Sequence, residues 1–339
     1  MSTEITTWAE LDAIRNTLDG DYILMNNLGP GDTGYDTYAS SSADAGAGFV
    51  PIGHYDADWT GHPFTGTFDG NNYIIDGLYI NRDQVDGIGF CAGLFGFVEG
   101  GTVENLGVTN VDITNIHTDW GASGGIIAYI VSSDTLLYNC YATGSITAGP
   151  WEIGGLVGYN LFGTVSNSYS TVTVNGDRVA GGLIGYHDRG VVENSYATGT
   201  VTRISGSTYT DFGGFVGTND RGKIINSYST GSVYYEGATH PTDKGFVGLV
   251  YTGGAYEMTG NFWDTDTSGQ TDTAGNAIGK TTAEMYDIAT FTTAPVDWDM
   301  EEIYLRNSRR PDYIWNILNG KTYPLLSWEQ LRTTKWSLV

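Results

Sequence analysis

Proline, basic residues and long apolar runs are all scarce in this sequence, and each shortage excludes a class of protein. Proline occurs 8 times in 339 residues and glycine does not fall at every third position, so the chain is not collagen. Lysine and arginine number 15 against 39 acidic residues, and the net charge of −24 repels phosphate backbones and anionic membranes. We therefore expect no nucleic-acid partner.

Apolar residues never run on for the length of a membrane span. No stretch of about 18 consecutive apolar residues exists, so we expect no insertion into a membrane. Residues 1–8 contain neither a basic nor an apolar segment, so we expect no signal peptide. The acidic excess fits either an ordinary acidic surface or adaptation to high salt, where the Debye length falls to about 3 Å at 1 M.

Glycine, in contrast, is abundant, with 49 residues, and much of it belongs to a repeat. An apolar pair bounded by small residues, nearly always glycine, recurs at 93–96, 125–128, 155–158, 182–185, 214–217 and 245–248. An asparagine followed by a small or apolar residue and then an aromatic one recurs at Asn139, Asn167, Asn194, Asn226 and Asn261, with looser versions near 77 and 105. A regular recurrence of this kind indicates a repeat architecture.

The pattern inside each repeat favours strands over helices. Segments 165–172 and 192–199 alternate in polarity over short stretches, which is typical of strands with one buried face. No long stretch has helical periodicity, and dense glycine destabilises helices. The sequence therefore predicts an all-β fold, a right-handed parallel β-helix (β-solenoid) of about seven coils with three short strands in each coil. A β-propeller is the less favoured alternative.

Stacked coils place equivalent residues in columns about 4.8 Å apart, so each recurring residue should contact its own kind. We expect an asparagine column that pairs amide to amide and a tyrosine column that stacks ring on ring. The predicted ladder comprises Asn139, Asn167, Asn194, Asn226, Tyr141, Tyr169, Tyr196 and Tyr228. Cys91 and Cys140 occupy different positions in their repeats, so we expect two buried free thiols.

At these same residues the sequence resembles a known family. The Gly-Leu-Val-Gly string at 155–158 and the Asn-Ser-Tyr strings are similar to the GLUG repeats of bacterial and archaeal surface and adhesin-like proteins. The resemblance covers roughly residues 60–290, including Phe64 to Gly70 at the entry and Trp263 to Gln270 at the exit. It implies surface display or adhesion, names no ligand, and implies no known catalytic set.

The two ends are expected to cap the solenoid, because open coils expose unpaired strand edges. We predict an N-terminal cap over 1–59, with a capping box at Thr7–Glu10 opening a short helix, the solenoid over 60–270, and an aromatic-rich C-terminal cap over 271–339, with a second capping box at Thr281–Glu284. The C-terminal tryptophans either seal this cap or form a docking patch. The residues of that patch would be Arg309, Arg310, Trp315 and Trp336.

Chemically specific motifs are few. Asp264, Asp266 and Ser268 resemble the start of a Ca²⁺ loop, but position twelve is Gly275 where that motif needs glutamate, so a solvated turn is favoured and Ca²⁺ is the only cofactor considered. Carboxylate pairs such as Asp56 with Asp58, or Asp211 with Asp220, resemble surface acid as much as an active site. Arg189 and Arg221 are expected to form one exposed row beside Asp188 and Asp220.

Two functions follow from these observations, and neither is enzymatic. One is an adhesin or receptor-binding module that meets a glycan or a protein at a cell surface. The other is a structural subunit of a particle, such as a virion decoration protein, spike or tail fibre, and a homo-oligomer stays open in both. The alternative is a polysaccharide lyase or hydrolase, because β-helices include such enzymes. We expect an extracellular, cell-surface or virion location.

Overall fold

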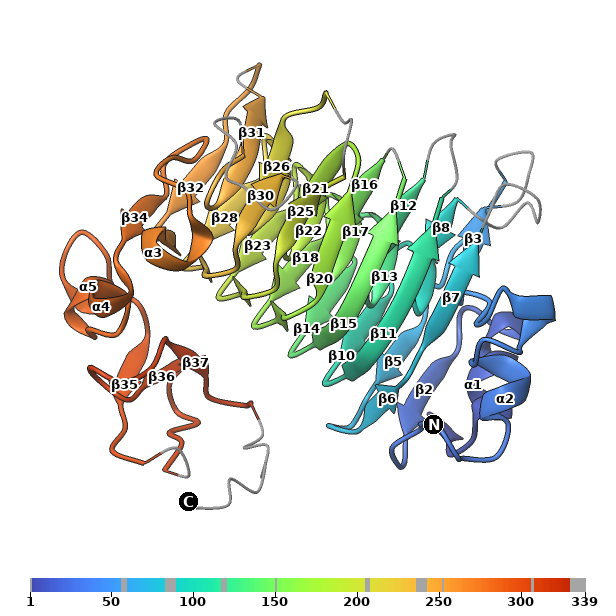
Figure 1. Cartoon of the computed structure of the whole chain (residues 1–339). Coiled ribbons are helices and arrows are strands. Elements are labelled where there is room, and N and C mark those ends of the chain that lie inside the picture. Colours follow the sequence, from blue (N-terminus) through green and yellow to red (C-terminus); the bar gives the residue numbers. More distant parts are fainter. Residues whose placement is uncertain are drawn as a thin grey trace, which may run out of the picture. The chain divides into compact units, whose positions relative to one another are not determined.

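The computed structural model describes residues 2–55, 60–82, 90–116, 121–149, 151–204, 208–235, 243–251, 253–305 and 308–329. The chain forms two compact units, Met1–Gly279 and Lys280–Val339, which are described separately. The first unit is a parallel β-solenoid, in which four sheets run side by side along the stack (Figure 1). We number these sheets I to IV in the order in which the chain meets them within one coil.

Sheets I and II are the longest. Sheet I contains β1 (Thr3–Ile5), β2 (Asp21–Leu24), β5 (Thr67–Asp69), β10 (Thr102–Glu104), β14 (Leu136–Tyr138), β18 (Thr164–Ser166), β23 (Val191–Glu193), β28 (Lys223–Ile225) and β32 (Glu257–Thr259). Sheet II contains β6 (Ile74–Asp76), β7 (Tyr79–Arg82), β11 (Gly107–Asn115), β15 (Tyr141–Ala148), β19 (Tyr169–Ser170), β20 (Thr173–Gly176), β24 (Tyr196–Ala197), β25 (Val201–Arg203), β29 (Tyr228–Ser229), β30 (Val233–Tyr235), β33 (Phe262–Asp264) and β34 (Ile278–Lys280).

Sheets III and IV complete each coil. Sheet III contains β8 (Cys91–Ala92), β12 (Ala122–Gly124), β16 (Glu152–Gly154), β21 (Val179–Gly181) and β26 (Asp211–Gly213). Sheet IV contains β9 (Phe95–Val98), β13 (Ile127–Val131), β17 (Val157–Leu161), β22 (Ile184–Asp188), β27 (Val216–Asp220) and β31 (Val247–Tyr251). A separate hairpin joins β3 (His54–Tyr55) to β4 (Gly61–His62).

The solenoid prediction is confirmed, with two corrections. The six strands of sheet IV define about six complete coils, and β32 and β33 only begin a seventh, so the predicted seven was one too many. Each coil also carries strands in four sheets where three strands were expected. Alternation in polarity does not reveal the difference, because strands of sheet III such as β16 and β21 are short and buried on both sides.

Two kinds of residue turn the chain at fixed corners. Between sheets I and II, the asparagines adopt the left-handed conformation, with φ of 52° at Asn139, 48° at Asn167 and 49° at Asn194, which asparagine tolerates better than most residues. Between sheets III and IV the backbones approach too closely for a side chain. A Cβ on Gly154 would meet the carbonyl oxygen of Val157 and lie 2.7 Å from the amide nitrogen of Gly185.

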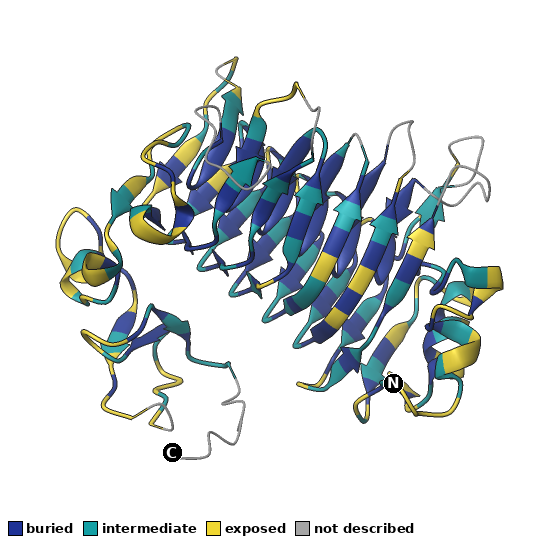
Figure 2. Cartoon of the chain, in the orientation of Figure 1, coloured by how far each residue is buried: buried dark blue, intermediate teal, exposed yellow. Residues whose placement is uncertain are grey.

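The core is a set of apolar columns inside the coils. The central residue of each sheet I strand pairs in register with its neighbours and is buried, giving the column Phe68, Val103, Leu137, Val165, Val192, Ile224 and Met258. Figure 2 shows this buried interior running the length of the solenoid. Burial of aliphatic and aromatic side chains stabilises the stack by about 25 cal/mol for each Å² of apolar surface removed from water.

The N-terminal segment extends and covers the first coil. Helix α1 (Trp8–Ala13) opens with the predicted capping box, in which Thr7 and Glu10 each cap the other's backbone. Trp8 and Leu11 are buried in the apolar core that also contains Phe68. The remaining short helices of this segment are η1 (Ile14–Asn16), α2 (Tyr35–Tyr38) and η2 (Asp44–Gly46).

The last coil is followed by α3 (Thr265–Ser268) and a loop that belongs to the same unit. Gln270 Nε2 donates a hydrogen bond of 2.7 Å to the Val233 carbonyl oxygen, and Ala274 and Ala277 pack against the core. Residues 271–279 therefore lie in the solenoid unit, whereas the sequence boundary placed them in a separate cap.

The second unit has a small core of its own. It contains α4 (Thr282–Met285), α5 (Ala289–Thr292) and a sheet of β35 (Met300–Glu302), β36 (Trp315–Ile317) and β37 (Leu325–Leu326). The predicted capping box at Thr281 and Glu284 is present. The Trp298 ring lies 4.7 Å from Phe291 and 4.8 Å from Trp315, so these aromatic rings form the centre of the unit.

Candidate functional site

The length of the connecting segment is nearly constant at two corners of the solenoid and varies strongly at one of the other two. The connection from sheet III to sheet IV is two residues long in every coil whose strands are described, and the connection from sheet I to sheet II is two residues long in every such coil after 70–73. The connections from sheet II to sheet III occupy 83–90, 116–121, 149–151, 177–178, 204–210 and 236–243. In repeat proteins, insertions of varying length collect on one face, which is often the binding face. We call this region the II–III corner.

Three side chains from successive coils meet at this corner. The Arg178 guanidinium carbon lies 3.9 Å from the centroid of the Trp151 ring and 4.7 Å from that of Tyr209. A cation held between aromatic rings is attracted by their electron-rich faces. The connections around Trp151 and Arg178 are the shortest of the set, and longer ones flank them on both sides along the stack.

Glu152 follows Trp151 and begins β16. Its side chain is buried, and its Oε2 has no hydrogen-bond partner among the described residues. Burial raises the pKa of Glu152 to about 7, against smaller lowering contributions from a backbone hydrogen bond and from Arg178. A carboxyl group with its pKa in the neutral range and an unpaired buried oxygen is a feature of functional sites more often than of packing.

Asp211 begins β26, two coils further along the same column of sheet III. Burial raises its pKa, and hydrogen bonds from the Thr210 and Thr218 hydroxyls, at 3.1 and 3.2 Å, act in the opposite direction. The Arg178 guanidinium lowers the pKa of both Asp211 and Glu152. Arg178 therefore acts electrostatically on both carboxyl groups of this surface.

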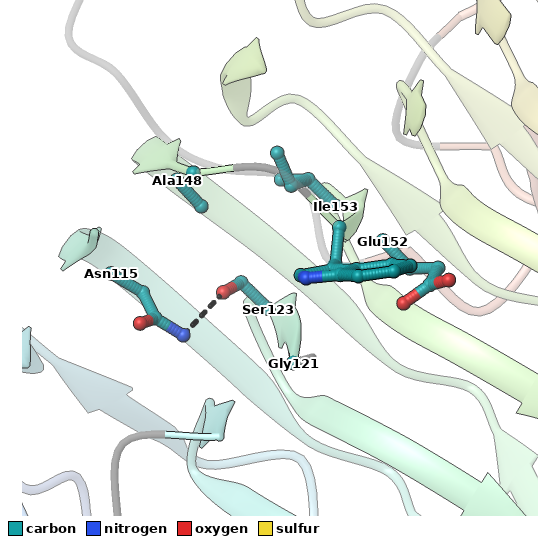
Figure 3. Close-up of a pocket in the computed structure, with 8 residues that line it drawn as sticks. Asn115, Gly121, Ser123, Ala148, Glu152 and Ile153 are labelled. Carbon is teal, nitrogen blue, oxygen red and sulfur yellow. Dashed lines mark hydrogen bonds between the residues drawn. The ribbon is translucent and has the colours of Figure 1, made fainter. Parts of the chain in front are cut away.

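A pocket opens at the corner beside Glu152. Its lining consists of Asn115, Gly121, Ser123, Ala148, Gly149, Trp151, Glu152 and Ile153. The Asn115 amide donates a hydrogen bond of 3.1 Å to the Ser123 hydroxyl, drawn as a dashed line in Figure 3. The Trp151 Nε1 is a second buried atom that has no partner within the described chain.

A tyrosine column in sheet IV lies within the electrostatic reach of Glu152. The Tyr159 ring stacks at 4.8 Å from Tyr129 and 5.0 Å from Tyr186. Burial, followed by the charges of Asp188 and Glu152, raises the pKa of the Tyr159 hydroxyl, so the phenol stays neutral. The neutral tyrosine hydroxyls therefore belong to sheet IV, and the buried Glu152 carboxyl belongs to the neighbouring sheet III.

The predicted exposed row of arginines and aspartates is present at the corner between sheets IV and I. Arg189 Nε lies 2.7 Å from Asp188 Oδ1, and Arg221 Nε lies 2.7 Å from Asp220 Oδ1. Arg221 also reaches Asp188 of the previous coil at 3.5 Å. These pairs form a salt-bridge ladder, in which solvent screens the exposed arginines while Asp188 is buried.

The residues predicted to form ladders are placed in neighbouring coils. The Tyr169 ring lies 4.9 Å from Tyr141 and 4.7 Å from Tyr196, which in turn lies 5.0 Å from Tyr228. These stacked rings help to hold successive coils together.

The asparagines stack differently. Asn139 donates an amide hydrogen bond of 3.2 Å to the Asn105 side chain, whereas Asn167 donates to the Tyr138 hydroxyl. For Asn194 and Asn226 the recurring feature is the left-handed turn described above.

The turn predicted as a weak Ca²⁺ site serves another purpose. Asp264 is fully buried and caps α3, accepting hydrogen bonds from the backbone amides of Asp266 at 2.8 Å and Thr267 at 3.1 Å. Ser268 is also buried. Within the described part of the chain, no group of three or more histidine, cysteine or acidic side chains is arranged to hold a metal ion.

The structure excludes Trp315 from the docking patch predicted in the second unit. Trp315 is fully buried, because it forms the unit's core, so it cannot contact a partner. Arg309 donates a hydrogen bond of 2.7 Å to the Leu326 carbonyl oxygen and faces Glu329, whereas Arg310 is the more exposed of the two arginines. Trp336 lies outside the described residues, as do Asp56 and Asp58.

Both cysteines are buried free thiols, as predicted. Burial raises the pKa of Cys91 and of Cys140 to about 12, so neither is a nucleophile at neutral pH. No helix in the described ranges is long and apolar enough to cross a membrane.

Comparison with known proteins identifies the class to which this solenoid belongs. The family described as the GLUG motif matches residues 149–175, 176–202 and 208–234, which are the coils that build the II–III corner. These three coils therefore carry GLUG motifs, as the sequence resemblance predicted. Over 162 residues, 46% of this chain, it is 33% identical to halomucin of Haloquadratum walsbyi, of which it covers only 2%.

Two solved structures share the fold. One, named IgA1 Protease, aligns with a TM-score of 0.52 at 19% identity over 79% of this chain and 19% of that chain. The other, provisionally named an immunoglobulin A1 protease of Bacteroides ovatus, aligns with a TM-score of 0.61 at 19% identity over 97% of this chain and 93% of that chain. Identity this low shows the fold alone.

These two names overturn the prediction that the chain is not an enzyme. That prediction rested on the lack of a recognisable catalytic set in the sequence, and it is contradicted because structural neighbours that share the fold are named as proteases. Sequence reasoning also missed Trp151, Glu152, Arg178 and Tyr209. The uneven spacing of the repeats was the available signal, but it gains meaning only once the longest insertions are seen to fall at one corner.

Proposed function

We propose that this chain is a surface-displayed binding module that engages its ligand at the II–III corner. The observation that carries the proposal is the concentration of variable connections at one corner, where Trp151, Arg178 and the buried Glu152 meet. Loops on a rigid scaffold carry function more often than the scaffold itself. Here the stacked coils provide the scaffold.

A place at the cell surface in a salty environment is supported by two findings. The chain resembles halomucin of Haloquadratum walsbyi, and its net charge is −24. A strongly acidic surface keeps neighbouring copies apart and stays soluble when salt screens its charges. An adhesin-like role fits both findings better than a particle subunit.

The test is binding to isolated cell envelopes at molar NaCl, measured by cosedimentation of the purified chain. Arg178→Ala removes the cation that joins Trp151 to Tyr209, and it should weaken binding about tenfold, which corresponds to about 1.4 kcal/mol. Arg221→Ala is the matched control, since it removes an exposed arginine from another corner. If Arg178→Ala and Arg221→Ala bind equally well, the II–III corner is not the binding site.

Turnover of the bound ligand is a second candidate function, and one observation favours it. The pKa of Glu152, raised to about 7, is suited to general acid or base catalysis at neutral pH. An assay for new reducing ends or new amino termini, comparing the wild type with Glu152→Gln, tests this directly. Activity that survives the substitution would exclude Glu152 from catalysis.

A further inference from the structure

The outer face of sheet II carries no charge over four consecutive coils, although the chain as a whole has a net charge of −24. Its outward residues alternate with buried ones along β15, β20 and β25. All of them except one asparagine carry a hydroxyl group, and we call them the hydroxyl face: Tyr141, Thr143, Ser145, Thr147, Tyr169, Thr171, Thr173, Asn175, Tyr196, Thr198, Thr200, Thr202, Tyr228, Thr230, Ser232 and Tyr234.

The hydroxyl face is a regular array in two directions. The strands β15, β20, β25 and β30 lie side by side in sheet II (Figure 1), and Thr147, Asn175, Thr202 and Tyr234 pair in register across them. Neighbouring coils repeat at about 4.8 Å, and alternate residues of one strand at about 6.6 Å. The outward side chains therefore form a lattice.

The lack of charge distinguishes this face from its neighbours. The outer positions of sheet I include Glu104, Glu193 and Lys223. Along the hydroxyl face itself, the first charge is Asp112, which pairs with Ser145 from the preceding coil. A polyanion or a polycation finds no opposite charge within these four coils, so the ligand that fits them is neutral.

The hydroxyl groups of one column cannot satisfy one another. They repeat at about 4.8 Å, whereas an O–H···O hydrogen bond spans about 2.5–3.0 Å. Asn175 has a longer side chain and reaches across this gap, because its Nδ2 donates a hydrogen bond of 3.3 Å to Thr147 Oγ1. Between two threonines, the gap fits an external oxygen that bonds to both.

Water meets this requirement at every gap of the array. Each hydroxyl both donates and accepts, as water does, so the lattice of side chains would hold rows of water at the same spacing. Ser145 and Thr171 are exposed, and Thr173, Thr200 and Thr202 are partly buried, so these columns are open to solvent.

The tyrosine column argues against a crystalline polysaccharide as the ligand. Such a surface would pack its sugar rings on the flat faces of aromatic side chains. The rings of Tyr141, Tyr169, Tyr196 and Tyr228 are stacked on one another at 4.9, 4.7 and 5.0 Å, so their faces are already occupied. The hydroxyl face therefore offers spaced hydrogen bonds and no stacking platform.

We infer that the hydroxyl face binds ice through rows of water held between its threonine and serine columns. Ice is neutral, donates and accepts hydrogen bonds, and repeats in two directions as this face does. The inference concerns a different face from the II–III corner and does not depend on the proposed function.

Two measurements test the inference on the full chain: the gap between its melting and freezing temperatures in the presence of ice, and its inhibition of ice recrystallisation. Both are made at the lowest NaCl concentration at which the chain stays folded. The wild type should show both effects, increasing with protein concentration. Thr173→Lys and Thr202→Lys each place a charge within the array and should lose most of both effects. Thr164→Lys is the matched control, because it places the same charge on the outer face of sheet I in the same coil, and it should behave as the wild type.

Unchanged melting temperatures of the protein would show that the variants are folded, and Thr173→Val, which keeps the side-chain shape and deletes the hydroxyl, replaces any lysine variant that is not. Absence of both ice effects in the wild type would overturn the inference, as would an equal loss in Thr164→Lys and Thr173→Lys. Cosedimentation with crystalline cellulose or chitin that Thr173→Lys abolishes, without any effect on ice, would also overturn it and would identify a neutral polysaccharide as the ligand of this face.

Discussion

Two columns of the solenoid, one in sheet II and one in sheet III, differ in whether the same residue type recurs from coil to coil. Along sheet II the same residue type recurs in consecutive coils, as Tyr141, Tyr169, Tyr196 and Tyr228. At the start of sheet III, each coil carries a different residue in register: Cys91, Ala122, Glu152, Val179 and Asp211. Stacking favours like residues in a column, so repetition marks packing and variation marks positions released for another purpose.

The largest test of this comparison removes a ring from the repeating column. Tyr196 is 6% exposed and lies between two stacked rings, so Tyr196→Ala should lower the free energy of unfolding by about 3–5 kcal/mol. Tyr209→Ala, at the exposed II–III corner, should change it by less than about 1 kcal/mol. Denaturant unfolding of both variants measures the contrast, and equal losses would abolish the distinction between the two regions.

A second test uses an exception within a repeating column. His187 replaces asparagine in the sheet IV column of Asn160, His187 and Asn219. Its Nδ1 accepts a hydrogen bond of 3.2 Å from the Asn160 amide and its Nε2 donates one of 3.2 Å to the Lys223 carbonyl. Burial lowers the pKa of His187 to about 4, so the native state holds a neutral ring.

The unfolded chain protonates this histidine near pH 6.5, so stability should rise as the pH rises from about 4 to 6.5 and fall as it drops. His187→Asn restores the residue of the neighbouring coils and should remove this dependence. The expected difference in unfolding free energy between pH 4.5 and 7 is on the order of 2–3 kcal/mol. Parallel pH profiles for the variant and the wild type would contradict a buried neutral histidine.

Glu152 should show the opposite sign. Its native pKa is raised to about 7, so its contribution is complete below about pH 4.5 and is lost as the pH rises towards 7. Arg178, Tyr129, Tyr159 and Cys91 are the charged and titratable groups that interact with it. Glu152→Gln should match the wild type at pH 4.5 and exceed its stability at pH 8 by about 2–3 kcal/mol. A variant less stable at pH 8 would mean that the ionised carboxylate has a stabilising partner.

The smallest expected effect concerns the whole surface, which both regions share. With a net charge of −24, repulsion between carboxylates should weaken at high salt, because the Debye length shortens from about 10 Å at 0.1 M to about 3 Å at 1 M. We expect the melting temperature to rise by a few degrees between these NaCl concentrations. Sucrose of equal osmolality serves as the control, and a flat response to NaCl would show that self-repulsion is negligible.

Sequence reasoning reached the solenoid because its strongest signals are packing signals. The recurring glycines and asparagines report the fixed corners, where Gly154 permits close backbone approach and Asn167 adopts a left-handed turn. The number of sheets was not accessible, because strands such as β16 are too short to alternate visibly. The prediction that Trp315 belongs to a docking patch failed because this residue is part of a small buried core. Composition alone cannot distinguish a buried aromatic residue from an exposed one.

The candidate site was almost invisible in the sequence. Trp151, Glu152 and Arg178 follow no motif, and each is ordinary in a chain with 9 tryptophans and 39 acidic residues. Their importance arises from the stacking of coils, which brings residues from different repeats to one corner. A repeat signal detects what is constant, whereas this site consists of what differs between repeats.

A foreign peptide could be inserted into the short connection at 177–178. The flanking strands keep their register in coils whose connection at this corner is much longer, as at 204–210. Doubling the length of a flexible loop costs only about 0.6 kcal/mol in closure entropy. A peptide grafted between Asp177 and Arg178 would be held beside equivalent loops of neighbouring coils, so grafts in several coils would be displayed at a spacing of about 4.8 Å. This regular spacing would suit the display of repeated epitopes at high salt.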